Sequence, residues 1–557
     1  MQGNSLFRKL TAFAKFDMKR FGGDADLVKV NRPKQDLNGA AAVENSVAQK
    51  ELGQQEKAGS ESEGKRKKKK KQKKKTAAQL ALRREEELNH LRNKHHIHAN
   101  GTDVPPPLAS FQELQDTYGV SEVILRNVLA QGYAEPTGIQ RQAVPLMLQG
   151  RDTMACAPTG SGKTAAFIVP VLHDLSQLMG EENGEENRGP RALILVPTRE
   201  LAKQSQREFR KLSKGLGLKI CVVEKEQTMA KKCQQQFDIL VTTPNRLIYM
   251  LKNELPLVTV SNLRWLVVDE CDKMFEAGKQ GFRDQLGTIY QACSNPNLRR
   301  ALFSATFAQD VEEWCKLNLD NVVQVHIGAK NTATNTVLQE LVFTGDEYGK
   351  LLAFRNLIKE GMTPPVLVFV QSKDRAKQLY TELMYENIRI DVMHADRPQG
   401  QRDEVVKNFR LGLIWVLVCT ELMGRGIDFK GVNLVVNYDF PTSAISYIHR
   451  VGRTGRAGKK GRAVTFFTEN DKPLLRNIAG MIRQAGCPVP EYMTAMKRPG
   501  KKERRNLAQN VPERKSILTM DVRDQERLKR KRKLVHKQSK DRKKMKLSAK
   551  PASQNQK

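Results

Sequence analysis

Strand-length apolar runs recur along the middle of the chain, and amphipathic stretches separate them. The first series of runs is Ala192–Val196, Ile239–Thr242, Trp265–Asp269 and Ala301–Ser304. The second series is Val366–Val370, Ile414–Cys419, Leu434–Asn437 and Ala463–Phe467. Buried parallel strands read as unbroken Val, Ile and Leu runs because helices cover both faces of the sheet. The alternation therefore predicts an α/β protein with two parallel sheets in tandem, each flanked by helices.

A polar stretch without a strong apolar pattern, about residues 328–350, divides the two series and predicts one domain on each side. The predicted organisation has five parts. They are a basic N-terminal tail (1–102), a first domain (103–328), a linker region (329–350), a second domain (351–492) and a basic C-terminal tail (493–557).

Most of the surplus positive charge lies on the two tails. The 557 residues carry a formal net charge of +34, of which residues 1–100 contribute +12 and residues 491–557 contribute +16. Runs such as Lys65–Lys75 and Lys529–Lys533 cannot bury themselves, so we expect disordered tails with a short helix within Thr76–Asn93. Their field favours polyanions, above all nucleic acid. Nuclear targeting and direct RNA contact both explain such runs and stay open.

Composition also excludes several classes of protein. The apolar stretches are far shorter than the ~20 residues that a membrane-spanning helix needs. Residues 1–20 mix apolar and basic side chains and lack the apolar core of a secretory signal. The eight cysteines are scattered without a Cys-x-x-Cys pair, which excludes a disulfide scaffold and a recognisable zinc ribbon and fits a reducing compartment.

The first series carries a phosphate-binding pattern. Residues 157–164 read APTGSGKT, between an apolar strand-like segment and a predicted helix. Gly160 and Gly162 let consecutive backbone N–H groups point at an anion, and the following helix adds its N-terminal dipole. Lys163 would reach the β- and γ-phosphates, and Thr164 would place its hydroxyl on Mg²⁺. The pattern predicts a phosphate-binding site.

Two carboxylates follow a later strand of the same series. Residues 266–272 read LVVDECD, and the apolar run delivers the acidic pair to the carboxyl end of a strand, where parallel sheets bind ligands. Asp269 is suited to hold Mg²⁺, directly or through water. Glu270 is suited to orient or deprotonate the attacking water. Acidic residues after a strand are weak evidence alone, but they are strong evidence downstream of a phosphate loop.

The ordered set of motifs resembles the DEAD-box RNA helicases. The resemblance spans about residues 103–492 and is closest to the branch that works in small-subunit ribosome assembly. Its first-domain motifs are the Q motif at Gly132–Gln140, then APTGSGKT, PTREL at 197–201, TPNRL at 243–247, DECD at 269–272 and SAT at 304–306. Its second-domain motifs are FVQS at 369–372, the Gln399 and Arg402 pair, Thr420, RGID at 425–428 and HRVGRTGR at 449–456.

The resemblance implies two RecA-like domains that bind and hydrolyse ATP. Gln140 would read the N6/N7 edge of adenine, as an amide does elsewhere, and Phe111 would stack on the same base. Asp428 would contact the ribose. The implied ATP-binding set is Phe111, Tyr133, Gln140, Ala157, Pro158, Thr159, Gly160, Ser161, Gly162, Lys163, Thr164 and Asp428.

Further roles follow from the second domain. Arg453 and Arg456 would reach across the cleft as arginine fingers and neutralise charge on the γ-phosphate. Together with Lys163, Asp269 and Glu270 they make the implied catalytic set, with ATP and Mg²⁺ as cofactors. Ser304, Thr306 and His449 would couple hydrolysis to the RNA side without doing chemistry themselves.

The same resemblance implies RNA contacts from both domains. The implied contacts are Arg199, Thr243 and Arg246 in the first domain and Gln371, Arg375 and Thr420 in the second. Contacts to phosphate and 2′-OH carry no sequence information, so unwinding would be independent of sequence. We expect a monomer in the nucleus and nucleolus that acts on pre-rRNA or snoRNA duplexes, with pre-ribosomal proteins as further partners and no membrane contact.

Some positions depart from the family pattern. Cys271 stands where Ala is commonest, Gly138 where Pro is usual and Glu421 where Asp is usual. None of these departures touches the implied catalytic set. Three alternatives stay open: an ATP-gated RNA clamp or scaffold, a DEAD-box helicase of the mRNA-export type (which the letters DECD also suggest) and a DNA-acting translocase.

Overall fold

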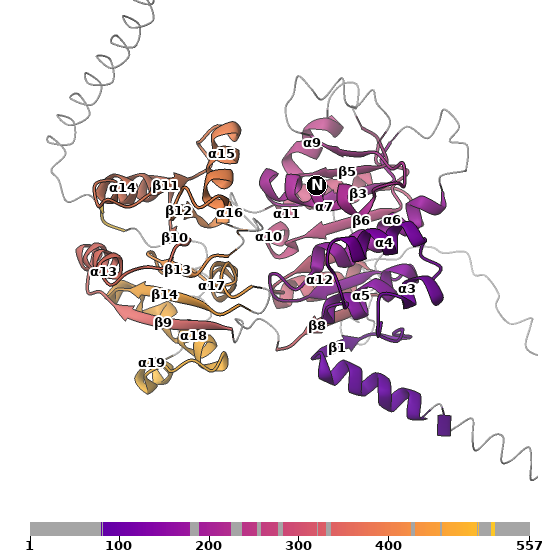
Figure 1. The fold of residues 1–557 in the computed structure, drawn as a ribbon, viewed down its shortest axis with the longest axis horizontal. Helices are drawn as coiled ribbons and strands as arrows, with labels where there is room; N and C mark the ends of the chain where they lie inside the picture. Colours follow the sequence, from indigo (N-terminus) through magenta and orange to yellow (C-terminus); the bar gives the residue numbers. More distant parts are fainter. Residues whose placement is uncertain are drawn as a thin grey trace, which may run out of the picture.

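The chain folds into two α/β domains that lie side by side, as the computed structural model shows (Figure 1). The structure describes residues 79–80, 82–178, 189–223, 237–252, 258–276, 282–319, 321–329, 336–424, 429, 431–456, 459–497, 500 and 514–517. The first domain precedes residue 330 and the second begins with the strand at residue 337. The predicted fold class of two parallel-dominated sheets flanked by helices is confirmed.

The first sheet has eight strands in the order β1-β8-β2-β7-β6-β3-β5-β4. All neighbours pair in parallel except β1 and β8, which are antiparallel. The strands are β1 (Ile97–Asn100), β2 (Thr153–Cys156), β3 (Ala192–Leu195), β4 (Ile220–Val222), β5 (Ile239–Thr242), β6 (Trp265–Asp269), β7 (Arg299–Ser304) and β8 (Val323–Ile327). Because β7 lies between β2 and β6, the loops after these three strands meet at one edge of the sheet.

Helices cover both faces of the first sheet, which is why its central strands are apolar throughout. One face packs against α3 (Glu113–Asp116), α4 (Glu122–Ala130), α5 (Gly138–Leu148), α6 (Lys163–Gln177) and α7 (Arg199–Leu212). The other packs against α9 (Pro244–Lys252), α10 (Cys271–Phe275), α11 (Arg283–Ala292) and α12 (Gln309–Asn318). Among the described residues, no helix combines the length and apolar character that crossing a membrane requires.

The second sheet has six parallel strands in the order β11-β12-β10-β13-β14-β9. The strands are β9 (Val337–Phe343), β10 (Val366–Val370), β11 (Ile390–Met393), β12 (Val416–Thr420), β13 (Leu434–Asn437) and β14 (Gly461–Phe467). Successive side chains of β10 enter opposite cores: Leu367 and Phe369 pack on one face, and Val366 and Val368 on the other. The central strands of this sheet are therefore buried on both sides.

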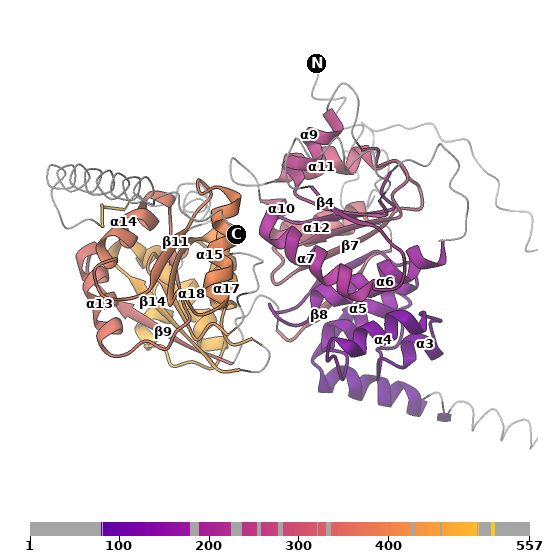
Figure 2. The ribbon, with the colours of Figure 1, turned by 45° about the horizontal axis from the view of Figure 1, so that its top comes forward.

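The helices of the second domain also form two layers. One core includes side chains of α15 (Gln399–Arg410), α17 (Ala444–Val451), α18 (Lys472–Gln484) and α19 (Glu491–Ala495), and the other those of α13 (Glu347–Lys359) and α14 (Lys373–Leu383). Short elements, α16 (Glu421–Gly424) and a 3₁₀ helix (Glu469–Asp471), complete the domain. In both views α15 and α17 face the first domain, and α13 and α14 lie away from it (Figures 1 and 2).

The structure corrects two predicted boundaries on the N-terminal side of each domain. Strand β1 lies inside the predicted N-terminal tail but pairs with β8, so the first domain begins before residue 103. Residues 82–94 form a helix, where the sequence predicts a short one. Strand β9 lies inside the predicted linker but pairs with β14 along its whole length. Both strands lie at sheet edges, where half-exposed positions break the apolar run that marks a central strand.

The C-terminal boundary also differs. Residues Arg514–Ile517, which the sequence places in a disordered tail, pack against the second domain, and Ile517 belongs to the core beneath α13 and α14. A single apolar residue within a charged stretch gives no periodic signal, which is why the prediction missed it. The Lys65–Lys75 and Lys529–Lys533 runs lie outside the described residues.

Candidate functional site

The phosphate loop connects β2 to α6 and contacts the second domain, where the carbonyl oxygen of Gly452 accepts from Thr159. Gly160 and Gly162 have φ angles of 79° and 87°, which side chains rarely adopt, and Gly162 is the N-cap of α6. The Lys163 Nζ atom donates to the carbonyl oxygens of Ala157 (2.7 Å) and Pro158 (3.2 Å). The lysine is thus folded back over its own loop, where a phosphate oxygen can replace the carbonyl groups as its acceptor.

Gln140 ties the start of α5 to this loop. Its Oε1 accepts a hydrogen bond from the backbone N–H of Thr137 (3.0 Å), and its Nε2 donates to the carbonyl oxygen of Gly162 (3.1 Å). The first bond completes a capping box with Thr137, which fixes the amide at the helix N-terminus. A side chain on residue 162 would approach Gln140 Nε2 to 2.5 Å, so glycine is needed for this contact. The structure therefore places the predicted adenine reader against the phosphate loop.

The acidic pair follows β6 and is buried. Asp269 and Glu270 are 4% and 5% exposed. Burial and the neighbouring Glu270 carboxylate raise the pKa of Asp269, and the positive charge of Lys163 opposes this rise. Glu270 is the N-cap of α10 with φ 50°, in the left-handed region. A non-glycine residue held there costs of order 1–3 kcal/mol, and such strain concentrates at functional sites.

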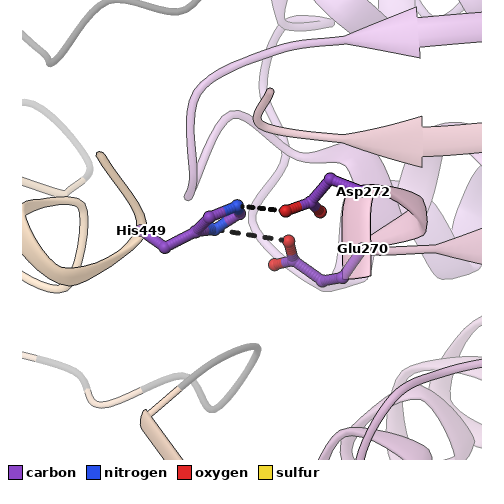
Figure 3. Close-up of side chains that lie close together, drawn as sticks. All are labelled: Glu270, Asp272 and His449. Atoms are coloured by element: carbon purple, nitrogen blue, oxygen red, sulfur yellow. Dashed lines mark hydrogen bonds and ion pairs between the residues drawn. The ribbon is translucent and has the colours of Figure 1, made fainter. Parts of the chain in front are cut away.

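A network of hydrogen bonds joins the acidic motif to the second domain (Figure 3). Asp272 Oδ1 accepts from the Ser304 hydroxyl (2.7 Å), and its Oδ2 lies 2.8 Å from Nε2 of His449. The same Nε2 lies 3.3 Å from the Thr306 hydroxyl, and Nδ1 lies 3.6 Å from Glu270 Oε2. His449 belongs to α17 and is 1% exposed, so this interdomain contact is buried. The predicted coupling residues Ser304, Thr306 and His449 are therefore brought together.

One of the two predicted arginine fingers, Arg456, lies against the phosphate loop, and the other, Arg453, is buried beside His449. Arg456 packs over Gly160, with Cγ 3.4 Å from the position of a Cβ on that glycine, and its Nε donates to the carbonyl oxygen of Gly452 (2.9 Å). The same carbonyl accepts from the Thr159 hydroxyl (2.6 Å), which ties the loop to the second domain. Arg453 is 1% exposed, and its Nε donates to the carbonyl oxygen of His449. Both side chains start from the end of α17.

The residues that would hold magnesium fit a divalent cation. Glu270 Oε2 is buried and has no hydrogen-bond partner among the described residues. Asp269 brings a second buried carboxylate, and burial raises its pKa, whereas both oxygens of Asp272 are already bonded to Ser304 and His449. Hard cations prefer such oxygen ligands, and a cation would offset the cost of burying them. Asp269 and the Thr164 hydroxyl are the ligands that the sequence predicts.

The predicted RNA-binding residues fall at the ends of neighbouring strands in each sheet. In the first domain, Arg199 is exposed at the start of α7, and Thr243 and Arg246 are half-buried after β5. In the second, Gln371 follows β10 and Thr420 ends β12, both half-buried. The carboxyl ends of parallel strands share one edge, so each set is grouped on its own sheet.

Three predicted residues lie away from these groups, and a fourth lies outside the described residues. The Phe111 ring is 5% exposed in the core of the first domain, and Tyr133 packs against the same core. Arg375 is buried and forms ion pairs with Asp439 and Glu347. Asp428 lies outside the described residues. Their predicted contacts with adenine, ribose and RNA stay predictions.

The sequence analysis missed three interdomain contacts. Asp272 was quoted as part of DECD but received no role, although its spacing of two residues from Glu270 placed it in the same turn. Arg402 of α15 forms an ion pair with Glu200 of α7 (2.9 Å), and Lys203 forms one with Asp403 (2.7 Å). No local pattern in the sequence shows which charges meet across a domain interface.

Comparisons with protein families agree with this geometry. The DEAD/DEAH box helicase model matches residues 137–314, which include the phosphate loop, the acidic pair and Ser304. The model of the helicase conserved C-terminal domain matches residues 349–458, which include His449 and both arginines.

Several curated proteins are similar over most of the chain. The rat protein (Rattus norvegicus) named "Probable ATP-dependent RNA helicase DDX52" is 57% identical over 78% of this chain and 72% of its own length. The cattle protein (Bos taurus) of the same name is 48% identical over 97% of this chain and 98% of its own. The ATP-dependent RNA helicase ROK1 of Lodderomyces elongisporus is 43% identical over 79% of each chain.

Solved structures share the fold. Dbp5 of S. cerevisiae bound to RNA and ADP BeF3 matches with a TM-score of 0.58 and 27% identity over 71% of this chain and 99% of that chain. Mss116p bound to ssRNA and AMP-PNP matches with a TM-score of 0.61 and 25% identity, over 70% of this chain and 81% of that chain. Both were solved with RNA and a nucleotide.

Proposed function

Because this chain belongs to the DEAD/DEAH box family of ATP-dependent RNA helicases, we propose that it remodels short RNA duplexes during assembly of the small ribosomal subunit. Its reaction is the RNA-dependent hydrolysis of ATP to ADP and phosphate. The observation that carries the proposal is the buried contact between the two domains, where Asp272 meets His449 beside Glu270 (Figure 3).

The phosphate loop binds the triphosphate. Lys163 exchanges the carbonyl oxygens of its own loop for oxygens of the β- and γ-phosphates, since a charge-assisted bond to phosphate is stronger than one to a neutral carbonyl. The α6 N-terminus adds backbone N–H groups and its dipole. Gln140, already fixed against Gly162, presents its amide to the adenine edge.

Glu270 orients and deprotonates the water that attacks the γ-phosphate. Its backbone is in the left-handed region, and its carboxylate lies between the domains, 3.6 Å from Nδ1 of His449. Arg453 and Arg456 neutralise charge that develops on the γ-phosphate, and fingers of this kind raise the rate on the order of 10³- to 10⁵-fold. Asp269 and the Thr164 hydroxyl would hold magnesium, which would supply further charge neutralisation on the phosphates.

Hydrolysis is coupled to RNA through domain closure. Ser304, Asp272 and His449 form a continuous chain of hydrogen bonds from the first sheet to α17. Closure therefore assembles the arginines at the loop and the two RNA-binding edges in one movement. A strand bent across both domains no longer fits a duplex, so the duplex opens locally, and release of phosphate lets the domains separate.

The small-subunit role rests on sequence likeness. The stretches at residues 314–322, 426–441 and 484–492 resemble the ribosome-assembly branch of the family. The lysine-rich runs suit nuclear and nucleolar targeting, and they suit binding to pre-rRNA or snoRNA duplexes. Phosphate contacts do not select a sequence, so partners such as pre-ribosomal proteins and the tails supply selectivity.

An ATP-gated RNA clamp is the second candidate function. The interdomain contact favours it as much as it favours a helicase, because both functions use closure on ATP and RNA. A clamp of this kind would hydrolyse ATP in the presence of RNA without separating strands at a matching rate. The mRNA-export role shares the whole ATP site and differs only in the RNA that is bound.

The test measures ATP hydrolysis and strand separation on the full chain, with single-stranded RNA, single-stranded DNA and a short RNA duplex. A helicase shows RNA-stimulated hydrolysis and ATP-dependent strand separation. Stimulation without strand separation identifies the clamp. Equal stimulation by DNA and RNA identifies a DNA-acting translocase and contradicts the proposal. Crosslinking of the protein to RNA in cells then decides between pre-rRNA and mRNA.

A further inference from the structure

A short C-terminal segment, Arg514–Ile517, packs against the second domain well beyond residue 458, where the match to the helicase C-terminal family model ends. Ile517 is 4% exposed and belongs to the core that includes side chains of α13 and α14. Its backbone N–H donates to Oε1 of Gln378 in α14 (3.1 Å), and the carbonyl oxygen of Lys515 accepts from Arg375 Nη1 (2.6 Å). The segment is therefore part of the folded domain, although no family motif includes it.

Arg514 fixes the side chain of Gln371, the residue that follows β10. Its Nε donates to Oε1 of Gln371 (2.6 Å). Because a guanidinium carries only donors, it must face the oxygen of the Gln371 amide, and the amide nitrogen is turned away from it. The backbone N–H of Gln371 donates to Asp439 Oδ2 (2.9 Å), so the backbone of this residue is held as well. The two bonds select one orientation of the amide.

Arg514 is itself held by a buried group of charges, the Arg514 cluster. Its acidic members are Glu347, Asp439 and Asp471, and its basic members are Lys350, Arg375 and Arg514. Arg514 Nη2 pairs with Asp471 (2.8 Å), and Arg375 donates two hydrogen bonds to Asp439. The Arg514 side chain is 4% exposed, and Asp439 and Asp471 are fully buried. A buried polar network in which the members are bonded to one another is rigid, so Arg514 offers Gln371 a fixed donor.

Gln371 lies at the sheet edge that carries the predicted RNA contacts of the second domain. It directly follows Val370, the last residue of β10, which is the register partner of Thr420 at the end of β12. The phosphate oxygens of RNA accept hydrogen bonds, and an amide nitrogen donates them. We propose that Arg514 is a positioning residue that orients the Gln371 amide so that its nitrogen donates to the RNA backbone. This inference rests on the proposed function, since it requires RNA at that edge.

Loss of Arg514 would free the Gln371 amide to turn its oxygen outward, and an amide oxygen cannot donate to a phosphate. The effect falls on RNA binding rather than on the chemical step, because Arg514 acts on Gln371 and on charges within the second domain. The opposite arrangement is a latch, in which the segment covers Gln371 and must leave before RNA binds. A latch predicts tighter RNA binding when Arg514 is replaced.

The experiment measures ATP hydrolysis by the full chain against the concentration of single-stranded RNA, and against ATP at saturating RNA. R514A should raise the RNA concentration for half-maximal stimulation about fivefold, as expected for one lost hydrogen bond. The kcat at saturating RNA and the KM for ATP should stay within about twofold. Q371A should match R514A, and the double variant should be no weaker, because both remove one interaction. R514K keeps a charged donor and should restore most of the RNA affinity.

Two variants serve as controls. K515A removes the same charge from an exposed neighbouring side chain, and D471N removes the other partner of Arg514 but leaves the bond to Gln371. Both should leave the half-maximal RNA concentration within about twofold of the unchanged chain. Thermal unfolding monitors the fold. If R514A does not fold, R514M in the D471N chain replaces it, since this pair removes both buried charges together with the bond to Gln371.

Four results overturn the proposal. Equal weakening by R514A and K515A means that only net charge matters, and tighter RNA binding by R514A identifies a latch. Effects of R514A and Q371A that add in the double variant mean that the two residues act independently. An unaltered RNA dependence of R514A, beside clear stimulation of the unchanged chain, overturns the positioning role alone. If RNA does not stimulate the unchanged chain at all, the proposed function itself is contradicted.

Discussion

At the scale of single residues, the site depends on buried charges whose surroundings differ. Among the described residues, no arginine pairs with Asp269 or Glu270, which lie beside a lysine and a histidine in an environment for a cation and a water molecule. Asp439 is equally buried but receives two hydrogen bonds from Arg375. The first environment is suited to chemistry and the second to stability. Cys271, the departure within DECD, is fully buried and packs in the core, so it takes no part in either.

Glu270→Gln should abolish turnover and leave binding intact. The amide keeps the size of the side chain but cannot accept a proton from water, so we expect kcat to fall about 100-fold or more. Affinity for ATP and RNA should stay within about twofold, because neither uses this carboxylate as a ligand. E276Q makes the same chemical change on a side chain that pairs with Lys273 outside the cluster and serves as control. Robust hydrolysis by E270Q would contradict the role of Glu270.

Asp439→Asn should destabilise the second domain in a pH-dependent way. The folded-state pKa of Asp439 is about 2, below its ordinary value of 3.8, so the carboxylate contributes stability above about pH 4 and loses it as pH falls toward 2. The shift corresponds to about 2 kcal/mol at neutral pH. Urea unfolding should therefore show a large difference between D439N and the unchanged chain at pH 7, and a shrinking one below pH 4. A difference that grows with acid would refute the assignment.

At the scale of elements, the edge strand β1 protects the first sheet although it has only four residues. Strand β1 covers the outer edge of β8, and the helix before it is tied down by Arg92, which donates to Gln142 and to the carbonyl oxygen of Pro105. An uncovered edge leaves a row of unpaired backbone groups that invites aggregation. The first domain therefore needs residues that its family motifs do not include.

A chain that starts at residue 103 should be less stable than one that starts at residue 79. The shorter chain loses β1 and the Arg92 contacts, and we expect its melting temperature to fall by at least about 5 °C. Thermal unfolding and light scattering of the two fragments measure the difference, and the full chain is the control. Equal melting temperatures would mean that β1 adds nothing to the domain.

The central strands could be predicted from the sequence and the edge strands could not. A strand such as β10 is buried on both faces and reads as an unbroken apolar run. Strand β9 reads VLQELVF, and Gln339 and Glu340 interrupt its apolar run, so the sequence gives no continuous strand signal there. The phosphate loop and the acidic pair were predictable because each is a local motif. The Asp272–His449 contact and the Arg514 cluster depend on residues far apart in the chain, which no local pattern encodes.

At the scale of the whole molecule, the two domains meet through charges as well as through the ATP site. Lys203 of α7 pairs with Asp403 of α15, and Glu200 pairs with Arg402 beside it. The Lys203–Asp403 pair is half-exposed and adds little to stability, typically ~0.2–1 kcal/mol, whereas Glu200 and Arg402 are buried. Both pairs fix how the domains align. The alignment decides whether the arginine fingers reach the phosphate loop.

Reversing one charge should impair the enzyme, and reversing both should restore it. K203E should lower RNA-stimulated hydrolysis about two- to fivefold, and D403K in the same chain should recover most of it. K211E is the matched control, since Lys211 lies on the same helix but pairs with Glu208 within it. RNA-stimulated ATPase assays compare the unchanged chain, K203E, the double variant and K211E. No recovery in the double variant would show that the pair does not align the domains.

The helix over residues 82–94 belongs to the first domain, and the docked Arg514–Ile517 segment belongs to the second. The first and last described segments of the chain therefore belong to different domains. A donor dye near residue 90 and an acceptor near residue 515 would report the distance between the domains in real time. Each domain thus has a labelling position outside the ATP site, so single-molecule measurements can follow the opening and closing of the two domains.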